Sequence, residues 1–270
     1  MTLYRAKPED GVAWITGAST GLGRQLALDL ASEGYTVAIT ARDPERMDSM
    51  ARDAEAMAGR IVGFFGDVTD EKVMDRTVAA IEKQLGPIVL AVFNAGSYYP
   101  THGERLDVYN FRSTFDVNLM GVIHGLVPVA DRMRDRGFGQ IAIVGSVTSY
   151  FGLPSAGAYG GSKAALNCIA QSLRYDFDKL NIRLQMFNPG FIDTPLTKKN
   201  KFAMPALMPV GKASARMVRG LKSGGFEVTF PRRLTWALKA MACLPSGLTY
   251  RALRLATGWD KRQFGIKRGR

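Results

Sequence analysis

The run Val12-Ala-Trp-Ile-Thr16-Gly17-Ala-Ser-Thr-Gly21-Leu-Gly23 decides the fold of this 270-residue chain. Its first five residues are mostly apolar and predict a short buried strand. Residues 24–33 follow with apolar side chains at helical spacing, and Gly34 marks the end of the predicted helix. A glycine-rich turn between a strand and a helix is the context that a dinucleotide site requires, although ordinary strand-to-helix turns share this spacing.

The three glycines of this turn have separate tasks in a nucleotide site. Gly17 permits a tight turn, Gly21 lets the backbone approach a pyrophosphate, and Gly23 allows the helix to pack closely on the sheet. The helix that begins here offers free backbone N–H groups to phosphate oxygens. We therefore expect a cofactor to be held by Gly17, Ser19, Thr20, Gly21, Leu22 and Gly23.

Apolar strands alternate with helical segments along the rest of the chain. Further strands are predicted at residues 35–40, 61–65, 88–93, 140–144, 182–187 and 226–230. Helices are predicted near residues 44–58, 70–85, 107–136 and 156–179. This alternation, with strands that are apolar almost throughout, indicates a parallel sheet covered on both faces. The predicted architecture is a single doubly wound α/β domain of the Rossmann type over residues 1–231, with a basic extension over residues 232–270.

The composition excludes several classes of protein. With 46% hydrophobic residues the chain can build one large core. No apolar run approaches the roughly 18 residues of a membrane-spanning helix, and the amino terminus lacks the apolar stretch of a secretory signal. Cys168 and Cys243 are too few for a disulfide framework, and with two histidines they do not make a metal site, so no metal is expected. These features favour a reducing, cytoplasmic location, with Cys168 in the core.

The net charge of +12 is concentrated in the last quarter of the chain. Residues 1–197 hold 19 Lys and Arg against 22 Asp and Glu, a balance of −3, whereas residues 198–270 hold 17 against 2, a balance of +15. Residues 234–244 and 248–255 read as two short helices that mix apolar side chains with Lys and Arg. The extension is expected either to associate peripherally with an anionic membrane or to pack on the domain or on a second subunit. No nucleic-acid partner is expected, because no DNA- or RNA-binding motif accompanies the charge.

The end of the second predicted strand indicates which dinucleotide binds. A site for NAD usually places an acidic residue there, where it binds the ribose 2′-hydroxyl. This chain has Ala41 followed by Arg42, and a guanidinium matches a 2′-phosphate in charge and geometry. Asp43 and Pro44 suit the start of the next helix, which leaves Arg42 free to bind and Arg46 as a second contact. NADP(H) is therefore expected in preference to NAD(H).

A serine, a tyrosine and a lysine supply the predicted chemistry. Tyr159 and Lys163 are four residues apart in a predicted helix and project from the same face, and Ser146 follows the strand before that helix. An ammonium group beside the phenol is expected to lower the tyrosine pKa, so that it exchanges a proton near neutral pH. A serine hydroxyl nearby can hydrogen-bond the oxygen whose charge changes. Combined with a dinucleotide site, these groups indicate hydride transfer between a nicotinamide and a carbonyl or alcohol.

Together the motifs resemble those of the short-chain dehydrogenase/reductase family. The resemblance covers residues 11–195 and includes the glycine turn, Ser146, Tyr159 and Lys163. It implies that Asn118 completes a catalytic tetrad by anchoring a water that relays protons to Lys163. It also implies that Tyr159 and Lys163 contact the cofactor. Further cofactor contacts implied by the resemblance are Asp67, Val68, Asn94, Ala95, Gly96, Pro189, Gly190, Ile192 and Thr194.

The expected function is NADPH-dependent reduction of a lipophilic ketone or aldehyde, with Tyr159 as the proton donor. The same residues also suit an NAD(P)-dependent alcohol dehydrogenase, because the direction of reaction depends on cofactor ratios. A third alternative is a nucleotide-binding membrane adaptor with residual catalysis. The resemblance implies a homo-oligomer, a dimer or a tetramer.

Two segments are expected at the mouth of the substrate site. Tyr98 and Tyr99 begin the loop after the fourth strand, where they suit either the mouth or the surface. Residues 195–211 are expected to form a lid, the alternative being an ordinary packed loop. The apolar inner face of such a lid would consist of Phe202, Met204, Leu207 and Met208.

Overall fold

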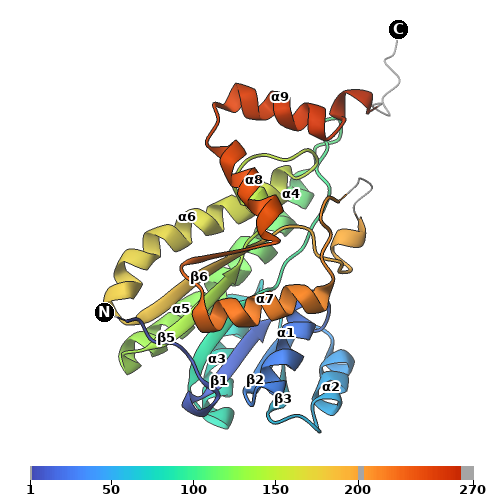
Figure 1. Cartoon of the computed structure of the whole chain (residues 1–270). Helices are drawn as coiled ribbons and strands as arrows, with labels where there is room; N and C mark the ends of the chain where they lie inside the picture. Colours follow the sequence, from blue (N-terminus) through green and yellow to red (C-terminus); the bar gives the residue numbers. More distant parts are fainter. Residues whose placement is uncertain (1, 200–203, 263–270) are drawn as a thin grey trace.

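A parallel β-sheet forms the centre of the molecule in the computed structural model, which describes residues 2–199 and 204–262 (Figure 1). Within these residues the sheet has seven strands in the order β3-β2-β1-β4-β5-β6-β7, and every neighbouring pair is parallel. The strands are β1 (Val12–Thr16), β2 (Thr36–Ala41), β3 (Arg60–Phe65), β4 (Ile88–Phe93), β5 (Gly139–Val144), β6 (Ile182–Pro189) and β7 (Glu227–Phe230). The strand order reverses between β1 and β4, which makes this a doubly wound Rossmann fold and confirms the predicted fold class.

Helices cover both faces of the sheet (Figure 1). One face carries α1 (Gly21–Ser32), α2 (Pro44–Asp53) and α7 (Val210–Ser223), and the other carries α3 (Glu71–Leu85), α4 (Val108–Phe115), α5 (Gly121–Arg136) and α6 (Gly157–Lys179). In β1, Ala13 and Ile15 enter the core beneath α1 and α7. Val12 and Trp14 enter the core on the opposite face. Burial on both faces explains why the strands read as nearly continuous apolar runs.

The long helix predicted at residues 107–136 contains an irregular turn. α4 ends at Phe115, and a π-helical turn, Asp116–Met120, joins it to α5. Asn118 lies in this turn and bonds the backbone of Ser97 twice: Oδ1 accepts from the N–H at 2.7 Å, and Nδ2 donates to the carbonyl at 3.0 Å. Apolar spacing does not reveal a π turn, because such a turn changes the helical repeat by only one residue. Such turns are frequent at functional sites.

The outer faces of α4, α5 and α6 carry apolar side chains that no described residue covers. Val108 is 75% exposed, Val127 is 54% exposed and Tyr175 is 79% exposed. Cys168, expected in the core, is exposed on α6. The reason is its place on the helix, since Leu166 and the other buried residues of α6 lie on the opposite side.

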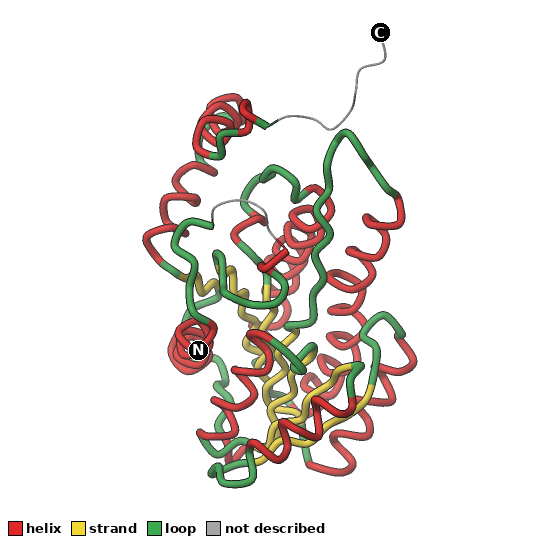
Figure 2. The backbone as a smooth tube through the Cα atoms, turned by 90° about the vertical axis from the view of Figure 1, so that its right-hand side faces the viewer, coloured by secondary structure: helices red, strands yellow, loops and turns green. Residues whose placement is uncertain are grey.

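Beyond β7 the chain forms two helices, as predicted, and Figure 1 places them past the carboxyl ends of the strands. Figure 2 shows the same helices beyond one end of the sheet, next to the C-terminus. They are α8 (Arg232–Ala242) and α9 (Ser246–Ala256). The hydroxyls of Thr235 and Thr229 bond at 2.9 Å, and Lys239 pairs with Glu227 at 2.5 Å, so α8 is fixed to β7. The extension thus packs on its own domain while its outer surface stays exposed. No helix in the described ranges is both long and apolar enough to cross a membrane.

Candidate active site

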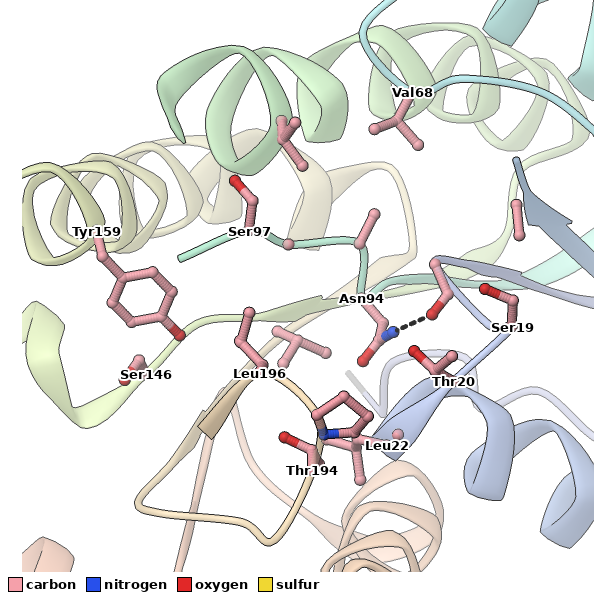
Figure 3. A pocket seen from close by; sticks show the side chains of 18 of the residues that line it. Ser19, Thr20, Leu22, Val68, Asn94, Ser97, Ser146, Tyr159, Thr194 and Leu196 are labelled. Atoms are coloured by element: carbon pink, nitrogen blue, oxygen red, sulfur yellow. Dashed lines mark hydrogen bonds between the residues drawn. The ribbon is translucent and has the colours of Figure 1, made fainter. Parts of the chain in front are cut away.

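A cavity of about 610 Å³ lies at the carboxyl ends of the strands, where the strand order reverses. In a doubly wound sheet this is the position where ligands bind. Its walls bring together residues that are distant in the sequence (Figure 3). Of the residues predicted for the site, the walls contain Gly17, Ser19, Thr20, Gly21, Leu22, Arg42, Asp67, Val68, Asn94, Ala95, Gly96, Ser146, Tyr159, Lys163, Pro189, Gly190, Ile192 and Thr194. Gly23 and Asn118, also predicted, lie behind the walls.

The glycine turn adopts backbone conformations that a larger residue would strain. Gly17 and Gly21 have φ values of +66° and +56°, in the left-handed region. A Cβ atom at Gly23 would lie 2.3 Å from the Asn94 amide nitrogen and 2.7 Å from the Gly17 carbonyl oxygen. Asn94 Nδ2 donates to that carbonyl at 3.0 Å, which ties the turn to the end of β4 (Figure 3). Gly23 therefore serves close packing behind the cavity and is not part of its surface.

The first turn of α1 opens on the cavity. Thr20 precedes the helix in an extended conformation, and its own side chain leaves the first-turn N–H groups uncapped. Ser19, Thr20 and Leu22 lie together at this end of the cavity (Figure 3). Uncapped N–H groups at the positive end of a helix dipole fit the diphosphate of a dinucleotide. The residues present therefore fit the class of cofactor that the sequence predicts.

Arg42 stands at the rim of the cavity, at the end of β2. Its guanidinium lies 3.5 Å from the Asp67 carboxylate, and its side chain is 74% exposed. Burial raises the pKa of Asp67, but hydrogen bonds from Thr69 and the charge of Arg42 outweigh that effect and hold the pKa below its ordinary value. Asp43 caps α2 as predicted, accepting from the Arg46 N–H at 3.1 Å, and also pairs with Arg46 Nε at 3.0 Å. Arg46 is thus engaged away from the cavity, and Arg42 is the arginine that faces it.

Ser146, Tyr159 and Lys163 meet at the other end of the cavity. Ser146 follows β5, and the other two stand one turn apart on α6. The Tyr159 hydroxyl points toward Ser146 (Figure 3), whose side chain favours the ionised phenol. Lys163 Nζ donates to the Val144 carbonyl at 2.7 Å and lies 5.8 Å from the centre of the Tyr159 ring. A phenol, a hydroxyl and an ammonium group therefore surround one space.

Burial governs the proton affinities of this group. Burial raises the pKa of Tyr159 to about 12, although the Ser146 side chain acts in the opposite direction and lowers it. Burial lowers the pKa of Lys163 to about 8. The prediction that Lys163 lowers the Tyr159 pKa is therefore wrong for the protein alone, because the ammonium is directed at a carbonyl and desolvation of the phenol is the larger effect. Tyr159 consequently keeps its proton across the neutral range.

Asn118 supports the site from behind the cavity wall. Its side chain is fully buried, and besides its bonds to Ser97 it donates to the Ser162 hydroxyl at 3.1 Å. Ser162 directly precedes Lys163 on α6, and Ser97 lines the cavity. Asn118 thus joins the loop after β4 to the helix that carries the tyrosine and the lysine. This geometry suits a positioning role, and the water relay implied by the resemblance stays a prediction.

A chain of polar side chains leads from Ser146 to the C-terminal helices. Asn188, in β6, accepts the Ser146 N–H at 3.0 Å and donates to Glu227 at 2.9 Å. Glu227 also accepts from Tyr150 and from Lys239, each at 2.5 Å. Burial raises the pKa of Glu227, but these hydrogen bonds outweigh it and hold the pKa below the ordinary value. Sequence patterns did not reveal this series of hydrogen bonds, because its residues come from four separate segments.

The residues at the mouth of the cavity differ in part from those predicted. Tyr99 lines the cavity. Tyr98 is instead buried, packing edge-on against the Tyr159 ring with the ring centres 5.4 Å apart. Its phenol therefore shields Tyr159 from one side.

The predicted lid, residues 195–211, reaches the cavity through Leu196 (Figure 3). Met208 packs against the core on the α7 side of the sheet, and Leu207 is exposed. Met204 is not part of the cavity wall, and Phe202 lies outside the described residues. The apolar residues predicted for an inner face thus do not act as one surface in the described part of the segment.

A second cavity, of about 660 Å³, lies between the loop after Ser146 and the C-terminal helices. Its wall is mostly apolar and includes Phe151, Leu153, Pro154, Ala242, Leu244, Tyr250, Leu253 and Trp259. The polar Tyr150 hydroxyl at its edge is already bonded to Glu227. The space therefore suits an apolar group better than a polar one.

The chain matches the family model described as short chain dehydrogenase over residues 11–204. The chain belongs to this family. A relative that is 34% identical over 242 residues, covering 90% of this chain and 96% of the relative, is an uncharacterized oxidoreductase of Myxococcus xanthus. Another, 30% identical over 187 residues that cover 68% of this chain and 70% of the relative, is the 3-oxoacyl-(acyl-carrier-protein) reductase MabA of Mycobacterium tuberculosis.

A solved structure shares the architecture. It is an alcohol dehydrogenase from Thermococcus sibiricus complexed with 5-hydroxy-NADP, with a TM-score of 0.74 and 24% identity over 81% of this chain and 95% of that chain. It confirms the predicted fold, and the family match confirms the predicted family. The protein is an NAD(P)-dependent oxidoreductase of the short-chain dehydrogenase/reductase family.

Proposed function

We propose that the protein reduces a lipophilic ketone or aldehyde with NADPH. The observation that carries this proposal is one cavity with two differently equipped ends. Ser146, Tyr159 and Lys163 face it at one end, and the uncapped helix start and Arg42 line the other. A redox cofactor and a carbonyl substrate are the pair of ligands that these two ends suit.

NADPH, when bound, supplies the hydride that reduces the carbonyl carbon. Tyr159 donates its phenolic proton to the carbonyl oxygen as that oxygen gains negative charge, and the product is an alcohol. Ser146 donates a hydrogen bond to the same oxygen. An alkoxide is a much stronger base than a phenolate, so a Tyr159 pKa of about 12 still leaves this proton transfer favourable. The glycine turn would hold the diphosphate, and Lys163 the ribose next to the nicotinamide.

Preference for NADPH is proposed from the position of Arg42. Its partner Asp67 lies 3.5 Å away, longer than an ordinary hydrogen bond, and most of the arginine side chain is exposed. A 2′-phosphate can therefore take the guanidinium without breaking a strong contact.

Replacement of this arginine tests the proposed preference. Arg42→Ala is expected to weaken NADPH binding about thirtyfold, the effect of one lost charge-assisted hydrogen bond, and to leave NADH binding nearly unchanged. Arg46→Ala is the matched control, because Arg46 pairs with Asp43 outside the cavity. Calorimetric titration of both nucleotides into the three proteins measures this. Equal affinity of the wild type for NADPH and NADH would contradict the preference.

The lipophilic class of substrate is proposed from the second cavity, because an apolar extension of the substrate fits its wall. Turnover of short aliphatic, long aliphatic and cyclic ketones with NADPH tests this class. The expected result is a kcat/KM that rises with apolar size. Highest turnover of the smallest, most polar ketone would contradict it.

Self-association as a dimer or tetramer is proposed from the exposed apolar residues of α4, α5 and α6. Val108, Val127 and Tyr175 form part of this surface. Covering such side chains removes apolar area from water, which favours association of subunits.

A further inference from the structure

A groove between α7, β7 and α8 has no part in the proposed reaction. Its volume is about 430 Å³, and its wall includes Arg216, Arg219, Arg232 and Trp236. Arg216 and Arg219 stand three residues apart on the exposed side of α7, and Arg232 and Trp236 stand one turn apart on α8. We call this surface the α7–α8 groove.

The wall of the groove also contains Glu227 and Lys239, which pair with each other, but its three arginines have no ion-pair partner within the described chain. None of its three arginines forms an ion pair with a residue in the ranges 2–199 and 204–262. Residues 204–262 hold 11 Lys and Arg but only two acids, Glu227 and Asp260. Glu227 is bound by Lys239, and Asp260 is bound by Arg254. The excess positive charge therefore faces outward, toward a partner of opposite sign.

Trp236 identifies the chemistry of that partner more closely. Its side chain is 66% exposed and belongs to the same wall as the arginines. An indole has a large apolar body and one N–H donor, and it is favoured at the interface between lipid headgroups and hydrocarbon. Guanidinium groups bind phosphate oxygens in a two-pronged manner. An exposed indole beside three arginines therefore matches a layer that is anionic outside and apolar beneath.

We propose that the α7–α8 groove docks on an anionic bilayer, with its arginines on lipid phosphates and Trp236 in the interfacial layer. The helix that would touch lipid also packs against a wall of the first cavity, since Gly190 lines that cavity and a Cβ atom there would lie 3.0 Å from Leu234 of α8. A second copy of the chain is a weaker candidate, because a two-fold contact through this groove would bring like charges together. The proposal does not depend on the identity of the substrate.

Co-sedimentation of the full chain with vesicles tests the proposal. Vesicles of equal parts phosphatidylglycerol and phosphatidylcholine are compared with vesicles of phosphatidylcholine alone, at low and high salt. Binding is expected only to the anionic vesicles and is expected to weaken as salt screens the charges. Each engaged cation contributes about fivefold to the affinity, which corresponds to about 1 kcal/mol. The triple variant R216Q/R219Q/R232Q should therefore bind about a hundredfold more weakly.

A matched control separates the groove from net charge. R52Q/R60Q/R76Q removes the same charge from three exposed arginines on α2, β3 and α3, and should change affinity by less than about threefold. Anionic vesicles should also shift the tryptophan emission of the wild type to the blue, a shift that Trp236→Phe should remove.

Three results with vesicles would overturn the proposal. They are no binding by folded full-length protein, equal binding to neutral vesicles, and equal losses in the two triple variants. Circular dichroism verifies that each variant is folded. If R216Q/R219Q/R232Q instead changed the sedimentation coefficient of the protein without vesicles, the groove would be a subunit contact and the proposal would fail.

Discussion

Polar groups differ in burial between the proposed catalytic cavity and the C-terminal helices. Behind the cavity, Asn118 and Asn188 are fully buried and bonded to the backbone that they support. On α8 and α9, by contrast, Trp236 and Leu255 are more than half exposed, and Arg232 and Arg233 lie in solvent. Loss of a partner leaves a buried polar group unsatisfied, whereas an exposed group is satisfied by water. Catalytic geometry should therefore be sensitive to single atoms in the first region and tolerant in the second.

The largest effect that this comparison predicts is that of Tyr159→Phe. Removing one hydroxyl removes the proton donor, so kcat for ketone reduction should fall about a thousandfold. Binding of NADPH should stay within a factor of about two, because the ring and its packing against Tyr98 remain. Steady-state kinetics and nucleotide titration of the purified variant measure both quantities.

Tyr98→Phe is the matched control for this prediction. It removes a hydroxyl from the neighbouring ring, whose contact with the Ser155 carbonyl is long, at 3.5 Å. Its kcat should stay near that of the wild type. Comparable losses in the two variants would show that packing, and not proton donation, limits the reaction.

Lys163 should make the rate of reduction fall at alkaline pH. Burial lowers its pKa to about 8, so the side chain is cationic below that pH and loses its charge as the pH rises through it. Tyr159 stays protonated over the same range, with a pKa of about 12. The value of kcat/KM for reduction should therefore be level below about pH 8 and fall about tenfold per pH unit above it. In Lys163→Arg, the activity that remains should no longer decrease above about pH 8, because a guanidinium keeps its proton.

The parts of the molecule that could be predicted from the sequence are those set by local patterns. Apolar runs predicted the strands, and the turn from Gly17 to Gly23 predicted which segment lines one end of the cavity. The helical spacing of Tyr159 and Lys163 placed both side chains on one face of α6. In each case the residues concerned are close together in the sequence or belong to the same helix or strand. The spacing of residues in the sequence is therefore enough to predict their arrangement.

What could not be predicted depends on contacts between distant segments. The π-helical turn at Asn118 follows from its bonds to Ser97 and Ser162, 21 and 44 residues away. The raised pKa of Tyr159 follows from burial, which no spacing of residues reports. Two of the four apolar residues expected on an inner face of the lid lie elsewhere, with Met208 against the core and Leu207 exposed, because apolar character does not determine which side of a loop faces inward.

Glu227 lies where the two regions meet, and its replacement should have the smallest of these effects. Glu227→Gln keeps the shape of the side chain but weakens the bonds from Asn188 and Lys239, and Asn188 in turn holds the Ser146 backbone. We expect kcat to fall about fivefold, which corresponds to about one weakened charge-assisted hydrogen bond. The KM for NADPH should stay constant. Glu104→Gln, which loses an ion pair with Arg262 instead, should leave kcat unchanged.

The pH dependence of stability distinguishes this role from general loosening of the fold. The pKa of Glu227 is below its ordinary value, so its stabilising effect is complete above the ordinary glutamate pKa and disappears as the pH falls through the lowered one. The difference in melting temperature between wild type and Glu227→Gln should therefore be constant at neutral pH and vanish in acid. A difference that persisted in acid would mean that the charge of Glu227 is not what joins α8 to the Ser146 backbone. If Glu227→Gln lowered NADPH affinity as much as it lowered kcat, α8 would also influence the end of the cavity proposed for the nucleotide. That result would contradict the expected difference between the two regions.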